Sequence, residues 1–186
     1  TAASKTMNLL TVPLESIGTA MATYAGQNLG AARMDRVRKG VNSALIIAVI
    51  YAVASLIILH YADITIMGLF LDTAKEVEIV AMGRQYLFWN SVFFIPLGWL
   101  IVWRYSIQGL GFSSLAMLAG VAEMVARTAV ALALVPLLGY MGAIMANPAA
   151  WVAACLFLYP AYIWTCRQLD NRLLAAKLHM QGPHAE

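Results

Sequence analysis

The sequence predicts an all-α integral membrane fold. Hydrophobic residues occupy 62% of the 186 positions and charged residues only 11%, and the mean hydropathy is +0.75. This composition is too apolar for a soluble domain of that length. Long apolar runs such as residues 41–59 lack the two-residue alternation of membrane β-strands. Because backbone polar groups in lipid must be hydrogen-bonded within their own segment, these runs are expected to be helices.

Several apolar segments are each near or above the roughly 20 residues that cross a hydrocarbon core. Five are predicted, at residues 2–29, 41–62, 83–107, 112–136 and 141–165. Residues 1–166 are therefore expected to form one bundle, followed by a basic tail at 167–186. Pro13 predicts a kink in the first segment, and Asn90 with Pro96 marks a polar, bendable point in the third.

Lysine and arginine collect after the first and after the fifth segment, and the positive-inside rule places both regions in the cytoplasm. These positions are Arg33, Arg36, Arg38, Lys39, Arg167, Arg172 and Lys177. The connector after the second segment is acidic on balance and is predicted outside. The N-terminus is then outside and the C-terminus cytoplasmic. Since topology accounts for the net charge of +3, nucleic-acid binding is not expected.

Cysteine and histidine spacing offers no catalytic or metal site. Cys155 and Cys166 lie in one predicted helix, about 16 Å apart at its usual rise, which is too far for a disulfide. His60, His179 and His184 have no ligand partner three or four residues away. No cofactor and no enzymatic activity are predicted.

Glu123 and Arg127 lie near the centre of the fourth segment, where a single charge costs at least roughly 2.5 to 3.5 kcal/mol on insertion scales. They are four residues apart on one helical face, with the acid first, which is the favoured order for an ion pair. Two interpretations follow. Either the pair is structural and neutralises itself, or it faces a water-filled cavity where Glu123 exchanges Arg127 for a proton or cation.

Three further side chains are candidates for an ion or substrate pathway. Glu15, two residues after Pro13, is either an ion or proton site or an interfacial residue. Arg104 either snorkels to lipid phosphates or lines a cavity. Asn90 either lines a cavity or makes an interhelical hydrogen bond. The tryptophans and methionines are expected mainly to anchor and pack, with some as candidates to line a pocket for flat, lipophilic cations.

Small and amide side chains gather at two predicted helix ends. Gly26, Gly30, Ala31, Gly109 and Gly111 permit close helix approach or a tight turn. The neighbouring amides, which are candidates for interhelical hydrogen bonds, are Gln27, Asn28 and Gln108.

Two connections are predicted beside these ends. Gly40 is also expected at a turn. The short link at 107–114 predicts an antiparallel hairpin of the third and fourth segments. Before the third segment, Asp72 or Thr73 with Glu76 resembles a capping box and predicts a short amphipathic helix.

Four sequence stretches together resemble one family. They are PLESIGTAMATYAGQNLGAARMDRVRKG, RYSIQGLGFSS, AGVAEMVAR and NPAAW. In these stretches the chain is similar to the C-terminal lobe of the multidrug and toxic compound extrusion (MATE) transporters, from the eighth to the twelfth helix. The resemblance implies a partial six-helix lobe whose partner, an N-terminal lobe of the same polypeptide, lies upstream. A start at Thr1, almost inside an apolar segment, likewise predicts that the chain is a fragment.

The resemblance implies drug/proton or drug/sodium antiport by alternating access in the cell membrane, with small lipophilic or cationic substrates and membrane lipid as partners. Some members use an aspartate in the tenth helix for coupling, but LFWNSVFFIPLGWLIVWRYSIQG contains no acid. Coupling is then expected at Glu123, at Glu15 or in the other lobe. The alternatives are a lipid-linked saccharide flippase of related architecture and a non-transporting membrane scaffold or truncation product.

Overall fold

The computed structural model describes residues 2–68 and 77–181, and this part of the chain is helical, without a strand. The helices are α1 (Ala2–Gly30), α2 (Met34–Gly68), α3 (Val77–Val92), α4 (Phe94–Gly109), α5 (Ser113–Leu138) and α6 (Tyr140–Gln181). The predicted all-α fold is confirmed. The predicted tail is helical from residue 167 to Gln181, because α6 continues through it.

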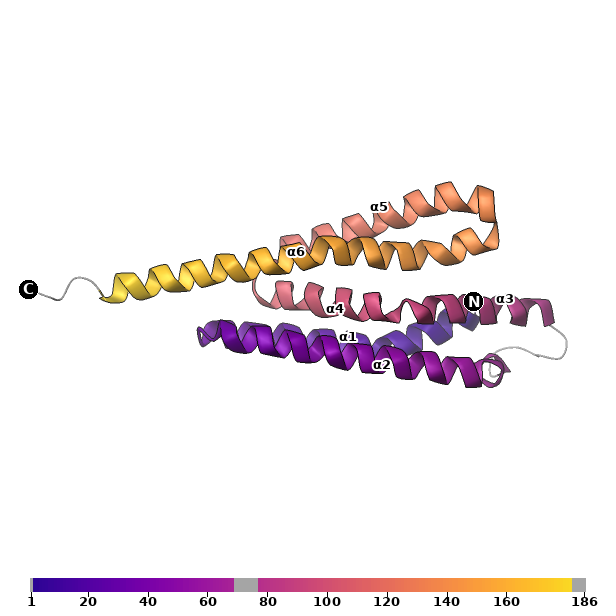
Figure 1. Cartoon of the computed structure of the whole chain (residues 1–186), viewed down its shortest axis with the longest axis horizontal. Helices are drawn as coiled ribbons and strands as arrows, with labels where there is room; N and C mark the ends of the chain where they lie inside the picture. The colour runs from indigo at the N-terminus through magenta and orange to yellow at the C-terminus, as the bar shows by residue number, and fades with distance from the viewer. Residues whose placement is uncertain (1, 69–76, 182–186) are drawn as a thin grey trace, which may run out of the picture.

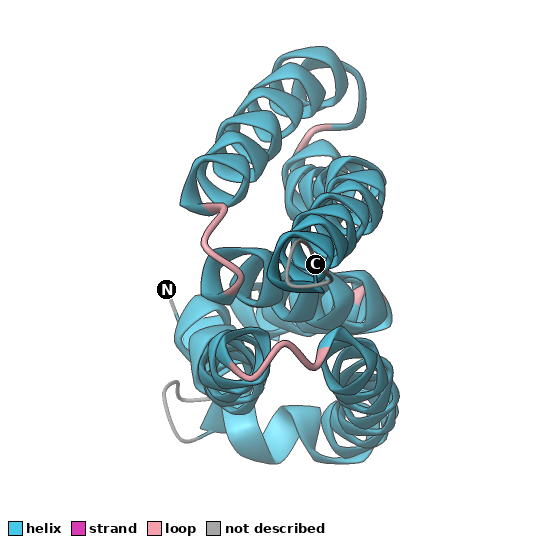
Figure 2. Cartoon of the chain, turned by 90° about the vertical axis from the view of Figure 1, so that its left-hand side faces the viewer, coloured by secondary structure: helices cyan, strands magenta, loops and turns pink. Residues whose placement is uncertain are grey.

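The helices form a layered bundle with α4 at its centre. The α1–α2 hairpin lies on one side of α4 and the α5–α6 hairpin on the other (Figure 1, and end-on in Figure 2). Helix α4 packs against α1, α2, α5 and α6, whereas α5 packs chiefly against α6. Side chains on opposite faces of α4 therefore look toward different pairs of helices.

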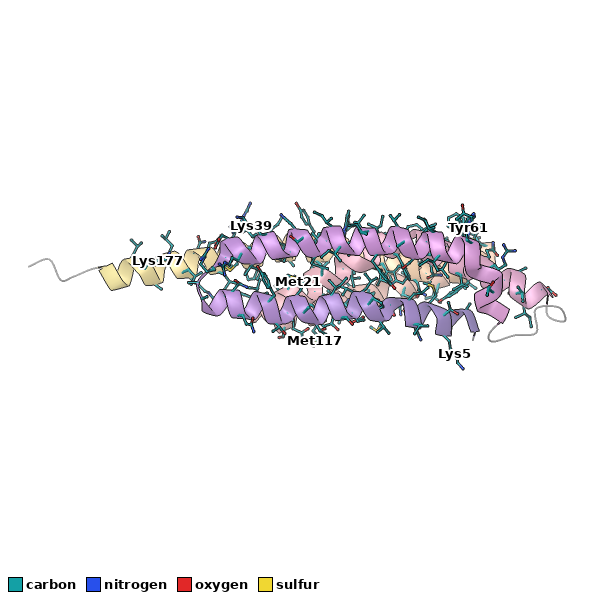
Figure 3. The ribbon with its side chains drawn as sticks, turned by 90° about the horizontal axis from the view of Figure 1, so that it is seen from below. Lys5, Met21, Lys39, Tyr61, Met117 and Lys177 are labelled. Carbon is teal, nitrogen blue, oxygen red and sulfur yellow. The ribbon has the colours of Figure 1, made fainter. Side chains whose placement is uncertain are left out.

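The same end of the bundle holds the α1–α2 turn, the α4–α5 turn and the far end of α6 (Figure 1). Lys39 and Lys177 lie toward this end, while Lys5 and Tyr61 lie toward the other (Figure 3). The two basic regions of the sequence are thus brought to one end. This arrangement is the one that a common cytoplasmic location requires.

The third predicted span is a bent pair of helices. Helices α3 and α4 meet at an angle of 52°, with Phe93 between them and its backbone N–H donating to the Asn90 carbonyl at 3.1 Å. Pro96 has no N–H to donate to the carbonyl of Val92, so the regular helical ladder stops there. The bend lies between the two residues that marked the flexible point in the sequence.

Three helices in the described residues, α2, α5 and α6, are long and apolar enough to cross a membrane, and the bent α3–α4 pair counts as a fourth. Helix α1 has 29 residues but is not among them, which differs from the prediction of five spans. It carries Lys5 and Glu15 beside several serines and threonines. Lys5, Glu15 and most of these hydroxyl side chains are exposed, so the polar surface of α1 lies mainly on the outside of the described bundle.

Of the predictions about the connections, the turn at Gly40 is wrong and the capping box is not described. Helix α1 ends at Gly30, but Gly40 lies inside α2, where an added Cβ would come within 2.9 Å of the Tyr24 ring. Gly40 therefore makes room for a tyrosine instead of forming a turn. The turn carries its positive φ at Ala32 (55°). The predicted capping box at 72–76 lies outside the described residues.

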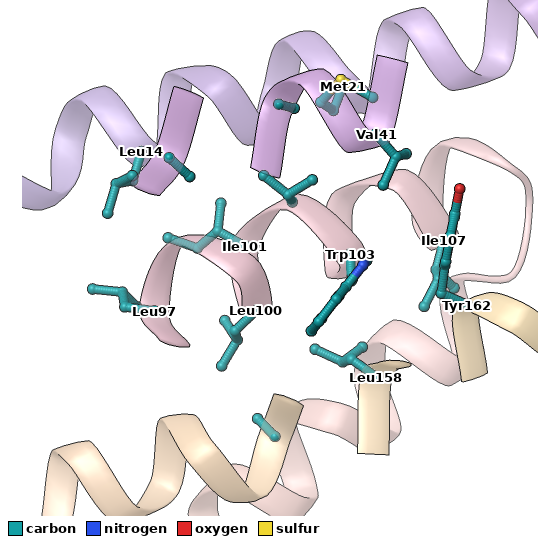
Figure 4. Close-up of a cluster of buried hydrophobic side chains, with 14 of the residues drawn as sticks. Leu14, Met21, Val41, Leu97, Leu100, Ile101, Trp103, Ile107, Leu158 and Tyr162 are labelled. Atoms are coloured by element: carbon teal, nitrogen blue, oxygen red, sulfur yellow. The ribbon is translucent and has the colours of Figure 1, made fainter. Parts of the chain in front are cut away.

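The core lies between α4 and its neighbours. Leu100 and Ile101 of α4 are buried between Leu14 of α1 and Leu158 of α6 (Figure 4). Helix α5 contrasts with this pattern, because its only buried side chains in the described structure are Ala116 and Ala119. Most of the α5 surface is therefore open to lipid or to further protein.

Candidate functional site

The ionisable candidates Glu15, Arg104, Glu123 and Arg127 lie on α1, α4 and α5, on a surface that we call the ionisable face. Arg104 and Tyr105 are neighbours on α4, and successive residues of a helix point about 100° apart. Arg104 consequently reaches α5, while Tyr105 reaches α1. Helix α4 links the two candidate carboxylates of the sequence, Glu123 and Glu15, through different side chains.

Glu123 binds two arginines. Its Oε1 accepts a hydrogen bond from Arg127 Nη2 at 2.7 Å, and its Oε2 accepts one from Arg104 Nη2, also at 2.7 Å. The exposed fractions are 17% for the Glu123 side chain, 26% for Arg104 and 48% for Arg127. Both carboxylate oxygens are thus occupied by charge-assisted bonds. The group as a whole carries one positive charge.

Glu123 and Arg127 form the salt bridge that their four-residue spacing predicts. Arg104 makes a different contact from the two predicted for it, which were with lipid phosphates and with a cavity. It ties α4 to α5 through Glu123. Its Nε is buried and has no hydrogen-bond partner in the described part of the chain. The guanidinium is therefore held by its Nη2 contact and by packing.

Glu15 has a different environment. Its Oε2 accepts a hydrogen bond from the Tyr105 hydroxyl at 2.7 Å, and its side chain is exposed on α1. Gly18 makes this contact possible, because a Cβ there would come within 2.6 Å of the Tyr105 ring. The tyrosine crosses α1 at this glycine. Glu15 thus has a neutral partner at one oxygen, and no contact of the other is seen within residues 2–68 and 77–181.

Asn90 makes a hydrogen bond within its own helix, and its role in lining a cavity stays a prediction. Its side chain is fully buried, and Nδ2 donates to the Tyr86 carbonyl of its own helix at 2.9 Å. The bond is therefore not interhelical. The Oδ1 atom has no partner among the described residues. Asn90 belongs to the bend between α3 and α4.

The two glycine-containing stretches of the family resemblance meet in space. A Cβ on Gly26 of α1 would lie 3.2 Å from the Gly109 carbonyl, and a Cβ on Gly109 would lie 2.7 Å from Ala22 Cα. Helices α1 and α4 therefore touch backbone to backbone at this point, which side chains would prevent. This contact fixes how α1 and α4 are aligned along their axes, and so places Tyr105 beside Glu15.

The remaining motif residues serve the turns. Asn28 Nδ2 donates to the Tyr24 carbonyl in the same helix at 2.8 Å, so the predicted interhelical bond of Asn28 is wrong. The backbone carbonyls of Gln27 and Gln108 accept bonds from Ala31 and Gly111, while both side chains are exposed. Gly111 takes a φ of +89° between α4 and α5, a conformation that favours glycine.

Two aromatic side chains of α4 line a separate groove on the opposite side of that helix. Trp99 and Trp103 lie with ring centroids 5.9 Å apart, and Trp103 lies 5.4 Å from Tyr159 of α6. They bound a cavity of about 540 Å³ between α2 and α6. The predicted pocket-lining tryptophans are thus separate from the ionisable face.

Sequence reasoning missed Tyr105 entirely and left Arg104 unpaired. The hydrogen bonds of these residues cross 90 and 19 positions of the chain, beyond the reach of helical spacing. The sequence signal for these contacts was an arginine followed directly by a tyrosine within an apolar helix. Grouped histidine, cysteine or acidic side chains that could hold a metal are not found among the described residues.

Comparison with known proteins agrees with this architecture. The MatE family model matches residues 1–133, which include α1 to α4 and most of α5. The searches of curated proteins and of solved structures gave no match. Because the family match covers well over half of a chain that is helical, apolar and multi-pass in character, this chain belongs to the MatE family of transporters.

Proposed function

We propose that the chain is part of a secondary active multidrug efflux antiporter of the cell membrane. It would export lipophilic or cationic compounds in exchange for protons or sodium ions. Membership of a transporter family supports the general activity, and the ionisable face of α1, α4 and α5 supports coupling to an ion. The N-terminus would lie outside and the basic end of the bundle in the cytoplasm.

The observation that carries the proposal is the unequal bonding of the two carboxylates. Both oxygens of Glu123 are taken by arginines, whereas Glu15 has one neutral partner, the Tyr105 hydroxyl. A coupling carboxylate must be able to exchange its partner for a proton or a sodium ion. Glu15 is therefore the first candidate for coupling, and Glu123 the second.

In this mechanism, an ion arriving at Glu15 would compete with the Tyr105 hydroxyl and loosen the contact between α1 and α4. The salt bridges of Glu123 would hold α4 and α5 together meanwhile. Alternating access further requires a second lobe that rocks against this one around a shared site. We propose that this partner is an N-terminal lobe of the same polypeptide, so the 186-residue chain alone would not transport.

The flippase alternative would need free cations to bind a pyrophosphate group. The two arginines of the face, Arg104 and Arg127, both donate to Glu123. Neither arginine of this face is therefore free to bind a pyrophosphate, which favours the antiporter as the activity of the ionisable face.

The proposal is tested with the full-length protein in proteoliposomes, by following efflux of an ethidium-like cation under a proton or a sodium gradient. Glu15→Gln should retain substrate binding but abolish the response to the coupling gradient. Glu78→Gln is the matched control, because Glu78 is an exposed acid at the start of α3, away from the face. Full gradient-driven efflux by Glu15→Gln would rule out coupling at this residue.

A further inference from the structure

The aromatic groove on the far side of α4 continues into a second cavity at the basic end of the bundle. The first cavity, of about 540 Å³, is lined by four aliphatic side chains of α2 between positions 45 and 50 and by Trp99, Trp103 and Tyr159. The second, of about 320 Å³, shares Leu45, Trp103 and Tyr159 with it. The shared walls make them one groove, which we call the α2–α6 groove.

The two halves of the α2–α6 groove differ in chemistry. The first half is lined entirely by aliphatic and aromatic side chains. The second half adds hydrogen-bond donors, namely Arg38, Asn42, Tyr162 and Arg167. The groove is therefore amphipathic along its length and suits an amphipathic ligand.

Unsatisfied donors at the polar half indicate an anionic ligand. Tyr162 is only 9% exposed. Its hydroxyl has no oxygen or nitrogen partner among the described residues, and the Cys166 thiol beside it is a weak one. Arg38 pairs with Asp170, while Arg167 has no ion pair in the described part of the chain. The polar half thus carries an uncompensated positive charge.

The length of the groove matches one leaflet of a bilayer. Arg38 and Ile50 both line it, and twelve residues of helix rise about 18 Å. Half of a hydrocarbon core is roughly 15 Å. A headgroup at the basic end would therefore leave its acyl chain along Trp103 and Trp99, ending near the middle of the membrane.

We propose that the α2–α6 groove binds one anionic phospholipid from the leaflet at the basic end of the bundle. The phosphate accepts hydrogen bonds from Arg167 and Tyr162, and one acyl chain lies against the tryptophans. The positive charge disfavours the lipophilic cations expected as transport substrates. If the proposed orientation holds, this leaflet is the cytoplasmic one, which is rich in anionic lipids.

The test uses the purified full-length protein in phosphatidylcholine vesicles, with phosphatidylglycerol brominated in its acyl chain as the probe. Bromine quenches tryptophan fluorescence on contact, and Trp99 and Trp103 both line the groove. Brominated phosphatidylglycerol should quench at a lower mole fraction than brominated phosphatidylcholine. Arg167→Gln should raise the phosphatidylglycerol needed for half-maximal quenching about tenfold, as expected for the loss of one charged hydrogen bond.

Two further variants test whether the quenching lipid binds in the α2–α6 groove. Arg172→Gln removes the same charge from α6, but Arg172 lies over the Phe112 ring and not in the groove, so quenching should not change. Ile50→Phe narrows the apolar half at a side chain that is 64% exposed, and should reduce quenching by both lipids. Size-exclusion profiles confirm that each variant is folded.

The proposal is overturned if the two lipids quench equally, or if Arg172→Gln acts like Arg167→Gln. Displacement of the quenching lipid by inorganic phosphate alone would show a free-anion site instead. Absence of quenching by either lipid would show that protein covers the groove. None of these results affects the gradient assay on Glu15, so the two proposals can fail separately.

Discussion

The two arginines bound to Glu123 should contribute unequally to stability. Glu123→Gln leaves both guanidinium groups without a counter-ion. Arg104 is three-quarters buried, and stranding a buried charge costs about 3 kcal/mol. Arg127 is half exposed and follows Glu123 by one helical turn. Because the proposed mechanism opens this face to water, the pair with Arg127 should contribute only about 0.3 to 0.5 kcal/mol. We therefore expect Glu123→Gln to destabilise the lobe by about 3 kcal/mol, mostly through Arg104.

Second substitutions separate the two contributions. Adding Arg104→Gln to Glu123→Gln removes the stranded buried charge and should recover about 2 kcal/mol. Adding Arg127→Gln instead should recover less than about 0.5 kcal/mol. Sequence spacing alone would choose Arg127 as the rescuing position, because it lies four residues from Glu123.

The measurement is reversible unfolding in mixed micelles with increasing dodecyl sulfate, followed by tryptophan fluorescence. Asp35→Asn is the control, since it breaks an exposed pair with Arg33 and should leave the unfolding midpoint nearly unchanged. Equal recovery by the two second substitutions, or greater recovery with Arg127→Gln, would contradict the assignment of most of the loss to Arg104. Restored stability with efflux still lost would indicate a functional role for Glu123 as well.

Three further outcomes are expected. Gly109→Ala forces α1 and α4 apart and should destabilise the lobe by about 1 to 3 kcal/mol. As its control, Gly30→Ala meets no atom within 4 Å and should change the unfolding midpoint little. Similar shifts of the midpoint for both variants would contradict the close crossing of α1 and α4. Gly18→Ala should displace the tyrosine bound to Glu15 and lower gradient-driven efflux while binding of the ethidium-like cation is kept, and unchanged efflux would argue against that contact. In a background without the native cysteines, cysteine at Arg36 should react with an impermeant thiol reagent only in inverted vesicles and cysteine at Lys75 only in intact cells; the opposite labelling would reverse the proposed orientation.

Features local to the sequence determined the fold class and the salt bridge between residues of one helix. Apolar length and composition identify a helical membrane protein, and Pro96 near Asn90 predicts a bend in the third span. Spacing of four residues predicts the salt bridge between Glu123 and Arg127. The bend and the salt bridge depend on residues close together in the sequence, where the backbone itself fixes which side chains are neighbours.

Only the folded lobe decides how each helix is rotated about its axis and how far it is shifted along that axis relative to its neighbours. Direct contact of the α1 and α4 backbones at Gly26 and Gly109 sets the level at which Tyr105 meets Glu15. The Arg38 pair with Asp170 joins positions 132 residues apart. Periodicity within one helix carries no information on the helix that will face it, because crossing geometry depends on how small side chains from distant segments fit together. The sequence by itself therefore determined which charges enter the membrane, and tertiary packing decided which partners they find there.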